Sequence, residues 1–171
     1  MVLYKLDEYD PDYQNDIFDG YDIKSFDVYA QDDKVGSVKN MMVDEDGSFR
    51  YFIVDTGFWI FGKNVLLPVG MANIDYDDKR VYAPLTKQQV EDLPEFSEDM
   101  AIDNDYEERV RGVYRPSMTM PITSTAFGIA PYSYTSEPYF YNLQDRNLTT
   151  YEERLRARRS GLGANIQSSK Y

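Results

Sequence analysis

The sequence has 171 residues and a net charge of −12, from 30 acidic and 18 basic side chains, and it contains neither histidine nor cysteine. The two missing residue types exclude disulfide bonds, thiolate nucleophiles, histidine bases, the usual zinc ligand sets and the common catalytic triads. Apolar runs such as Asn64–Val69 are too short to span a bilayer, and the first residues turn acidic instead of forming a secretory signal. We therefore expect a soluble, cytoplasmic protein without membrane insertion.

Charge is distributed unevenly along the chain. Residues 1–108 carry a net charge of −17, whereas residues 109–171 carry a net charge of +5. Such an asymmetry is typical of a change of structural unit, and phosphate backbones repel the acidic part. We expect no direct nucleic-acid binding. The basic part could contact an acidic partner, a phosphate or the protein's own acidic part, although simple solubility also explains its charge.

The N-terminal half of the chain shows the pattern of a β domain. Residues 1–22 mix tyrosine and aspartate without a clear period, which predicts an irregular acidic arm. Short apolar runs then alternate with turn motifs, as β-strands do. Gly36 predicts a bulge or sharp bend, and Asp46-Gly47 predicts a tight hairpin turn. The expected strands lie at residues 26–30, 35–44, 49–55, 65–69, 72–76 and 81–83.

Helical and irregular segments follow the strands. Thr86–Gln89 is typical of a capping box and predicts a short helix that ends at Pro94. Residues 97–147 contain four of the eight prolines, interleaved with tyrosine, serine and threonine, which predicts a partly ordered linker. Thr150–Glu153 is a second capping box and predicts a short basic helix within residues 148–171. The apolar stripe of this helix consists of Leu148, Tyr151 and Leu155.

Five or six short strands within residues 23–96 predict a mainly β domain. A small closed antiparallel barrel is the expected architecture, because closure removes the sheet edges that a domain of this size cannot cover. The predicted order is an arm over residues 1–22, the barrel and its short helix over residues 23–96, a linker over residues 97–147, and a basic terminal segment over residues 148–171.

Several short motifs follow one another in a characteristic order in this domain. They are Lys34–Val38, Val43–Gly47, Phe49–Gly57, Gly62–Val69, Leu85–Val90 and Leu93–Phe96. Together they resemble the PRC-barrel family, to which the cytoplasmic domain of the photosynthetic reaction centre H subunit and the C-terminal domain of the ribosome maturation factor RimM belong. The first motif departs from the family pattern, because aspartate stands where the family has its first glycine.

The resemblance implies a six-stranded barrel that acts as a docking or assembly module, with no general catalytic activity. A second stretch, Asn147–Leu155, resembles the start of a domain of unknown function that follows PRC-barrels in some bacterial, notably cyanobacterial, stress-associated proteins. We therefore expect a stand-alone, cyanobacterial-like member of the family that is not an enzyme and binds no cofactor.

Two alternative functions stay open. The likeness to RimM implies a ribosome- or RNA-processing-linked assembly factor that acts through protein contacts. The abundant carboxylates allow a metal or small-ligand binding protein in photosynthetic or stress physiology. In each case the protein partner is unidentified, and a homo-oligomer such as a homodimer is possible because the arm and the terminal helix both need a surface to cover.

Two groups of residues are candidates for partner binding. The first is an aromatic loop between two glycines, where large exposed apolar side chains would anchor an interface or cap the mouth of the barrel. The second is the basic terminal helix, whose arginines would meet an acidic surface or simply form an exposed face. The candidates are Phe58, Trp59, Phe61, Arg154, Arg156 and Arg158.

Two clusters of carboxylates come into question as metal or catalytic sites. They are Asp44, Glu45 and Asp46, and Asp75, Asp77 and Asp78. Neither has EF-hand spacing, and a barrel filled by its own side chains offers no cleft for a sugar between paired acids. Solvated turns are the preferred interpretation, so no metal site and no catalytic residue is predicted.

Overall fold

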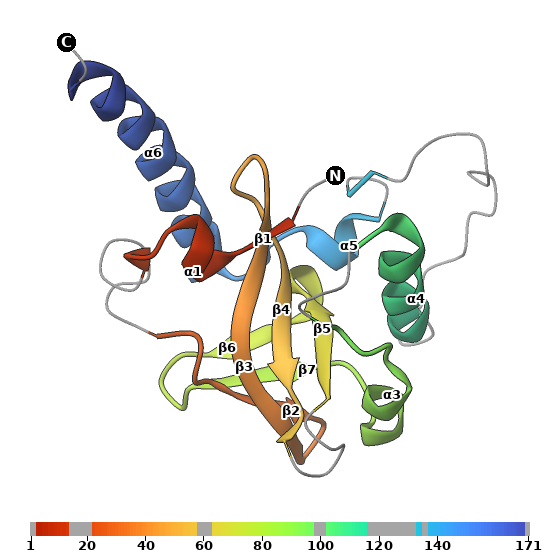
Figure 1. The fold of residues 1–171 in the computed structure, drawn as a ribbon. Coiled ribbons are helices and arrows are strands. Elements are labelled where there is room, and N and C mark those ends of the chain that lie inside the picture. The colour runs from red at the N-terminus through yellow and green to blue at the C-terminus, as the bar shows by residue number, and fades with distance from the viewer. Residues whose placement is uncertain are drawn as a thin grey trace.

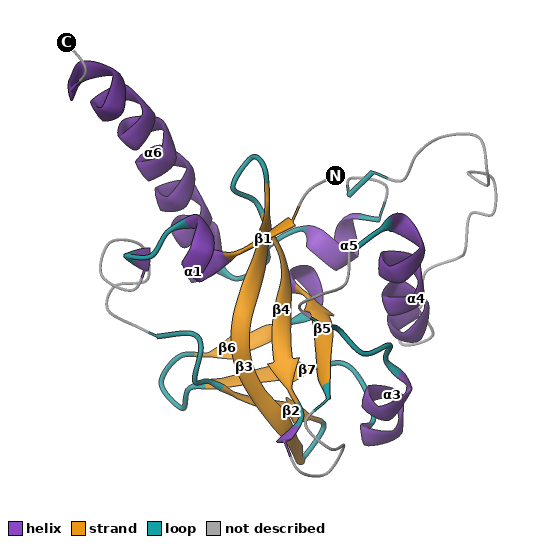
Figure 2. Ribbon diagram, viewed as in Figure 1, coloured by secondary structure: helices purple, strands orange, loops and turns teal. Residues whose placement is uncertain are grey.

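The computed structural model describes residues 3–13, 22–57, 63–97, 102–115, 133–134 and 137–169, with side chains up to residue 158. A strongly curved sheet forms the body, with helices around it, and the C-terminal helix extends away from it (Figures 1 and 2). The strands are β1 (Leu3–Lys5), β2 (Asp27–Ala30), β3 (Asp33–Asp44), β4 (Phe49–Asp55), β5 (Asn64–Pro68), β6 (Asn73–Asp75) and β7 (Arg80–Ala83). The helices are α1 (Leu6–Tyr9), η2 (Val69–Met71), α3 (Lys87–Asp92), α4 (Asn104–Tyr114), α5 (Pro138–Tyr141) and α6 (Arg146–Ser169).

The six predicted strands are confirmed, and β4 matches its predicted bounds at both ends. They form one sheet in the order β5-β4-β3-β2-β7-β6, with β1 paired to β3. Five of the pairings are antiparallel, but β2 and β7 run parallel, with Val28 opposite Val81. The prediction of a wholly antiparallel barrel is therefore wrong for this pair.

Closure of the barrel is not confirmed either. Within the described residues, no ladder joins the end strands β5 and β6. After β5 the chain turns at once through η2, and Pro68 at the end of β5 lacks the N–H that a further ladder bond would use. The short helix α5 packs on η2 at this place. A Cβ on Gly70 would lie 2.6 Å from the carbonyl carbon of Phe140, so the glycine permits this close approach.

Local backbone features of the sheet agree with the sequence. A Cβ on Gly36 would lie 2.2 Å from the carbonyl oxygen of Asp55, so β3 can bend across β4 at this residue. A register irregularity follows directly, between Val28 and Tyr29 of the paired strand β2. Gly47 has a φ of 84°, as the predicted hairpin turn requires.

The N-terminal arm is more regular than predicted. Leu3–Lys5 pairs with the end of β3, and α1 follows without a gap. The side chain of Leu6 is fully buried, and only 2% of the surface of Tyr13 is exposed. Apolar contact with the sheet, which no local pattern reveals, therefore orders the arm.

The segment predicted as a linker contains a helix of three turns. The Asp103 carboxylate accepts a hydrogen bond from the backbone N–H of Tyr106 and caps α4. Tyr106, Val110 and Tyr114 are buried on one side of this helix. The tyrosine hydroxyl of Tyr114 donates to the carbonyl oxygen of Leu66 on β5 at 2.8 Å, which fastens the helix to the sheet.

The terminal helix begins earlier and runs longer than predicted. Its first turn is capped by Asp145, whose carboxylate accepts from the backbone N–H of Leu148 at 2.9 Å. The predicted capping box at Thr150 lies inside the helix, where the threonine hydroxyl instead donates to the carbonyl of Arg146 at 3.0 Å. The predicted stripe of Leu148, Tyr151 and Leu155 is buried and joins the core of the sheet.

Candidate functional site

The predicted aromatic loop lies outside the described residues. Phe58, Trp59 and Phe61 fall between the end of β4 and the start of β5, in a stretch whose structure is not described. Their role as partner anchors therefore stays a prediction. The three candidate arginines lie within the described residues. The structure also shows a groove at β6 that the sequence analysis did not predict.

The candidate arginines of α6 face the protein's own acidic parts. The Nε atom of Arg158 lies 2.7 Å from Oδ2 of Asp10, and its guanidinium is also 3.3 Å from Asp12. Arg156 contacts the hydroxyl of Ser48 and pairs with Glu152 at 3.5 Å. Both arginines thus join the helix to the acidic part of the chain, one of the three roles that the sequence left open for the basic segment.

The third arginine takes part in a different contact. The guanidinium of Arg154 lies 5.7 Å from the ring centroid of Tyr151 on the same helix, within the range of a cation–π contact. The three arginines therefore do not converge on one place, and each has a contact inside the protein. Whether they also meet a partner stays a prediction.

The carboxylates of the β3–β4 turn hold the turn together. One oxygen of Asp44 accepts from the backbone N–H groups of Asp46 and Ser48, and the other pairs with Arg50 at 2.8 Å. Asp44 is 4% exposed, so its bonds are internal to the turn. In the described part of the chain, no group of three or more acidic side chains is placed to hold a metal ion.

A buried polar network, which the sequence analysis missed, joins β4 to α4 and α5. The hydroxyl of Tyr51 donates to Oε1 of Glu107 at 2.9 Å and lies 2.5 Å from the hydroxyl of Tyr141. Tyr134 donates to the same oxygen of Glu107 at 2.8 Å, and Arg111 donates to the hydroxyl of Tyr141 at 2.9 Å. Glu107 therefore receives two hydroxyl donors inside the protein.

The hydrogen bonds of this network hold β4, α4 and α5 together. Burial raises the pKa values of Tyr51, Tyr134 and Tyr141 above the ordinary tyrosine value, so the three hydroxyls stay protonated and can donate. The guanidinium of Arg50 lies 4.2 Å from the ring centroid of Tyr134 and covers the network from the side. The tyrosines of the predicted linker were its signal in the sequence, but their partners on β4 and α4 could not be named.

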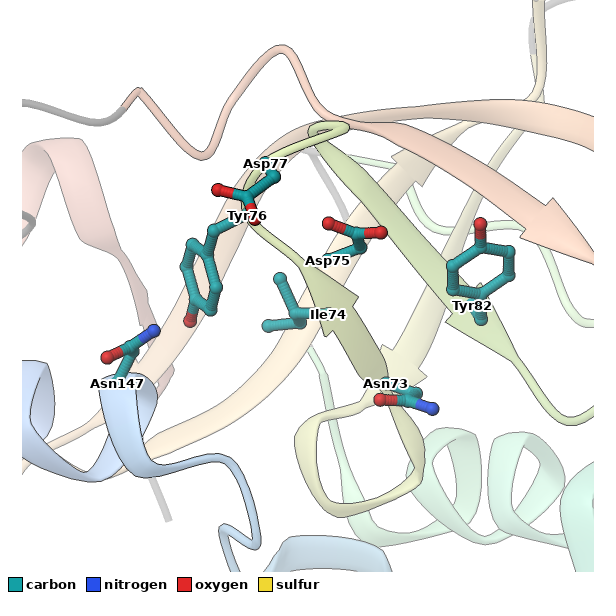
Figure 3. A pocket seen from close by; sticks show the side chains of 7 residues that line it. All are labelled: Asn73, Ile74, Asp75, Tyr76, Asp77, Tyr82 and Asn147. Atoms are coloured by element: carbon teal, nitrogen blue, oxygen red, sulfur yellow. The ribbon is translucent and has the colours of Figure 1, made fainter.

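A groove lies along the outer edge of β6, which is the last strand at one end of the sheet (Figure 3). It has a volume of about 570 Å³. The strand itself and the turn after it form most of the wall, and the first turn of α6 adds one residue from the far end of the chain. The lining consists of Asn73, Ile74, Asp75, Tyr76, Asp77, Tyr82 and Asn147.

The groove is polar and its walls are held in place. The hydroxyl of Tyr76 donates to Oδ1 of Asp145 at 3.1 Å, which connects the β6 wall to the cap of α6. Oδ1 of Asp75 accepts from the backbone N–H of Asp78 at 3.1 Å, which orders the following turn. In Figure 3 the carboxylate of Asp75 lies on the Tyr82 side of the strand, and Tyr76 lies on the Asn147 side. The groove thus presents carboxylates and tyrosine rings around a strand edge.

The fold agrees with a comparison against protein families. Residues 15–90 match the family model of the PRC-barrel domain. Residues 15–90 therefore carry a PRC-barrel domain. The resemblance predicted from the six motifs is therefore confirmed, and the groove at β6 lies within the matched residues except for Asn147.

One curated relative is similar to part of the chain. It is a protein of Deinococcus radiodurans named "Uncharacterized protein", which is 43% identical over 82 residues. The match covers 46% of this chain and 30% of the relative, so the chain spans less than a third of the relative's length. Among the described residues, none of the helices combines the length and apolar composition that crossing a membrane requires.

Proposed function

We propose that this protein is a non-catalytic protein-interaction or assembly module built on its PRC-barrel domain. The observation that carries the proposal is the groove along β6, where a strand at the end of the sheet order borders a hollow of about 570 Å³. A strand edge of this kind offers backbone donors and acceptors to another chain. Interaction sites commonly use such edges together with tyrosine rings.

The use of the buried titratable groups supports a non-catalytic role. Glu107, Arg111 and Tyr51 would be the strongest candidates for acid–base chemistry, because they are close together and buried. However, each of them bonds to the others or to a neighbouring element, and none of the three is more than 4% exposed. A general acid or base has to reach the proton that it transfers, so this arrangement favours a structural role.

The proposal is tested by photo-crosslinking in the native host. A benzophenone amino acid replaces Asn73, which is exposed at the groove, and in a matched control it replaces Gln88, which is exposed on α3. In Figure 1, β6 is drawn behind β3 at the left of the sheet, and α3 lies at the lower right, beyond β5. We expect discrete protein adducts from position 73 and none of the same mass from position 88, with the adducts identified by mass spectrometry.

Two outcomes contradict the proposal. Adducts that are identical at both positions would indicate non-specific encounter instead of a docking site. A native-like circular dichroism spectrum without any adduct at position 73, combined with turnover of a substrate by the purified protein, would replace the interaction module with an enzyme. An adduct that contains a second copy of this chain would indicate that the module assembles with itself.

A further inference from the structure

We infer that the groove takes an extended, positively charged peptide segment of a partner protein, which pairs with β6 as an additional strand. The inference rests on the proposed function and adds the mode of binding and the chemistry of the partner. Three properties of the groove support it: the unpaired edge, the charge of the lining and the fixed far wall.

The edge of β6 differs from the edge at the other end of the sheet. At that end, the carbonyl of Asn64 on β5 accepts from the backbone N–H of Phe96 at 2.7 Å, and the carbonyl of Leu66 accepts from Tyr114. Segments after the sheet therefore cover β5. In the described residues, β6 pairs with β7 on one side, and no hydrogen bond from another segment reaches its backbone on the other. Its free edge can thus accept a strand.

The length of the edge sets the length of the partner segment. β6 has three residues, from Asn73 to Asp75. A strand of this length extends about 10 Å at the usual rise per residue, so roughly three to five residues of a partner can pair with it. Side chains of such a segment alternate between the two faces, and every second one would point towards the carboxylates.

The lining selects a cationic partner. Asp75 and Asp77 contribute two carboxylates to the groove, and the seven lining residues include no basic side chain. Tyr76 and Tyr82 add aromatic rings, which attract ammonium and guanidinium groups through their negative faces. Arg80 stands opposite Asp75 on β7, and its guanidinium lies 4.6 Å from the ring centroid of Tyr29 and also bonds to the side chain of Tyr82. The charge selection therefore rests on Asp75 and Asp77, and the ring of Tyr76 is the aromatic contact open to a partner cation. Lysine or arginine side chains therefore fit this site better than acidic ones.

The far wall of the groove is fixed before a partner arrives. The bond from Tyr76 to Asp145 ties the end of the β6 segment to the first turn of α6, which positions Asn147. A preformed wall lowers the entropy that binding costs, because fewer side chains become ordered on binding. The wall also makes this site more selective than a flat sheet edge, at which any strand could pair.

The test uses three fluorescein-labelled heptapeptides and fluorescence anisotropy. The first alternates lysine with valine and threonine, the second carries glutamate at the lysine positions, and the third carries proline at the central valine of the first. We expect the lysine peptide to bind at least about tenfold more tightly than the glutamate peptide, and its affinity to fall with salt because the contact is partly exposed. Proline should weaken binding about tenfold or more, since it removes a ladder donor.

Two charge-matched variants locate the site. The Asp75→Asn/Asp77→Asn variant keeps the acceptor for the Asp78 N–H and should weaken the lysine peptide about tenfold. Glu91→Gln/Asp92→Asn removes the same charge from the exposed surface of α3 and should leave the affinity within about twofold. Hydrogen exchange should slow at Asn73–Asp75 when the lysine peptide is bound.

Each remaining outcome overturns the inference. Equal affinity for the lysine and glutamate peptides would remove the charge selection, and equal affinity for the proline peptide would remove strand pairing. Equal losses in the two charge variants would show a non-specific attraction to an acidic protein. If no peptide binds at millimolar concentration while position 73 still gives crosslinked adducts, the inference fails but the proposed function stands.

Discussion

Glu107 is a carboxylate inside the protein that accepts hydrogen bonds from two tyrosines of different segments. Tyr51 belongs to β4, and Tyr134 belongs to the stretch before α5. The neighbouring Glu108 points outwards and pairs with Arg115, which in turn pairs with Glu137 at 2.8 Å. Two consecutive acids of α4 therefore hold the helix to the rest of the chain, one on the buried side and one at the surface.

Replacing Glu107 should destabilise the protein strongly. Glu107→Ala leaves two buried tyrosine hydroxyls without their acceptor and leaves Arg111 without its nearest carboxylate in the core, 4.0 Å away. We expect the free energy of unfolding to fall by about 3 kcal/mol. Urea denaturation followed by circular dichroism measures the change. Glu91→Ala on the exposed side of α3 is the control, and a loss equal to that of the control would contradict the structural role of Glu107.

Alanine substitutions at two glycines should change the stability of the protein in opposite directions. At Gly70 an added Cβ would meet the backbone of Phe140 and Tyr139 within 2.7 Å, whereas a Cβ added at Gly112 on α4 would meet nothing within 4 Å beyond its chain neighbours and the backbone of its own helix. Gly70→Ala should therefore destabilise the protein by about 2 kcal/mol through overpacking. Gly112→Ala should stabilise it by about 0.5 to 1 kcal/mol through helix propensity. Thermal unfolding of both variants checks the pair, and the same sign for both would disprove the assigned packing of α5.

At the scale of elements, α6 docks on the sheet through one face. Its buried residues Leu148, Tyr151 and Leu155 pack on the core, and Glu152 accepts from the backbone N–H of Phe49 at 2.9 Å. Arg158 then reaches Asp10 near the start of the chain. The helix thus contacts the beginning of β4 and the N-terminal arm at once, and its docked half is part of the folded body.

The docking of α6 should depend on pH through Glu152. Burial is the largest cause that raises the pKa of this carboxyl above 4.5, and the bond from Phe49 N–H and the Arg156 charge oppose it. Because the folded pKa is raised, the ionised group costs stability at neutral pH, and this cost disappears as the pH falls through the folded pKa. Glu152→Gln keeps an acceptor for Phe49 but cannot ionise.

We therefore expect the stability of Glu152→Gln relative to the unmodified protein to be greater at pH 7 than at pH 4. Urea unfolding at both pH values measures this difference. Glu153→Gln, at the adjacent exposed position, is the control that removes the same charge from this turn of the helix. A Glu152→Gln variant whose relative stability rises on acidification would contradict the buried position of this carboxyl.

At the scale of the whole molecule, tyrosine titration should follow unfolding. The chain has 16 tyrosines, and burial raises the pKa of several of them above 10, among them Tyr51, Tyr106 and Tyr114. Since the unfolded chain loses these protons near pH 10, stability should fall as the pH rises beyond that value. Absorbance at 295 nm should show a second, cooperative step that coincides with loss of the circular dichroism signal. A single titration near pH 10 with an unchanged fold would contradict it.

The strands were predictable from sequence because their signals are local. Alternation and turn residues such as Asp46-Gly47 act within a few positions, and the capping box at Thr86 is confirmed by both of its hydrogen bonds. The helix α4 was also within reach, since Asp103 is a good N-cap and Tyr106, Val110 and Tyr114 recur at helical spacing. The prolines on either side of this stretch concealed its pattern.

Other features depend on contacts between distant residues. The parallel pairing of β2 with β7 and the docking of Arg158 on Asp10 join residues that no periodicity connects. The groove at β6 exists because this strand ends the sheet order, and Asn147 closes it from another part of the chain. Its carboxylates were noted in the sequence, but as solvated turns, since a cluster of acids alone does not reveal the edge beside it.

The parallel pairing of β2 and β7 has a consequence for synthesis of the protein. β7 begins fifty residues after β2 ends, so β2 leaves the ribosome long before its second neighbour exists. At ordinary translation rates the delay is roughly 3 to 10 s. Until then β2 can pair with β3 alone, and its other edge stays open to nascent chains nearby. A chain terminated before Arg80 would keep that edge permanently and should aggregate.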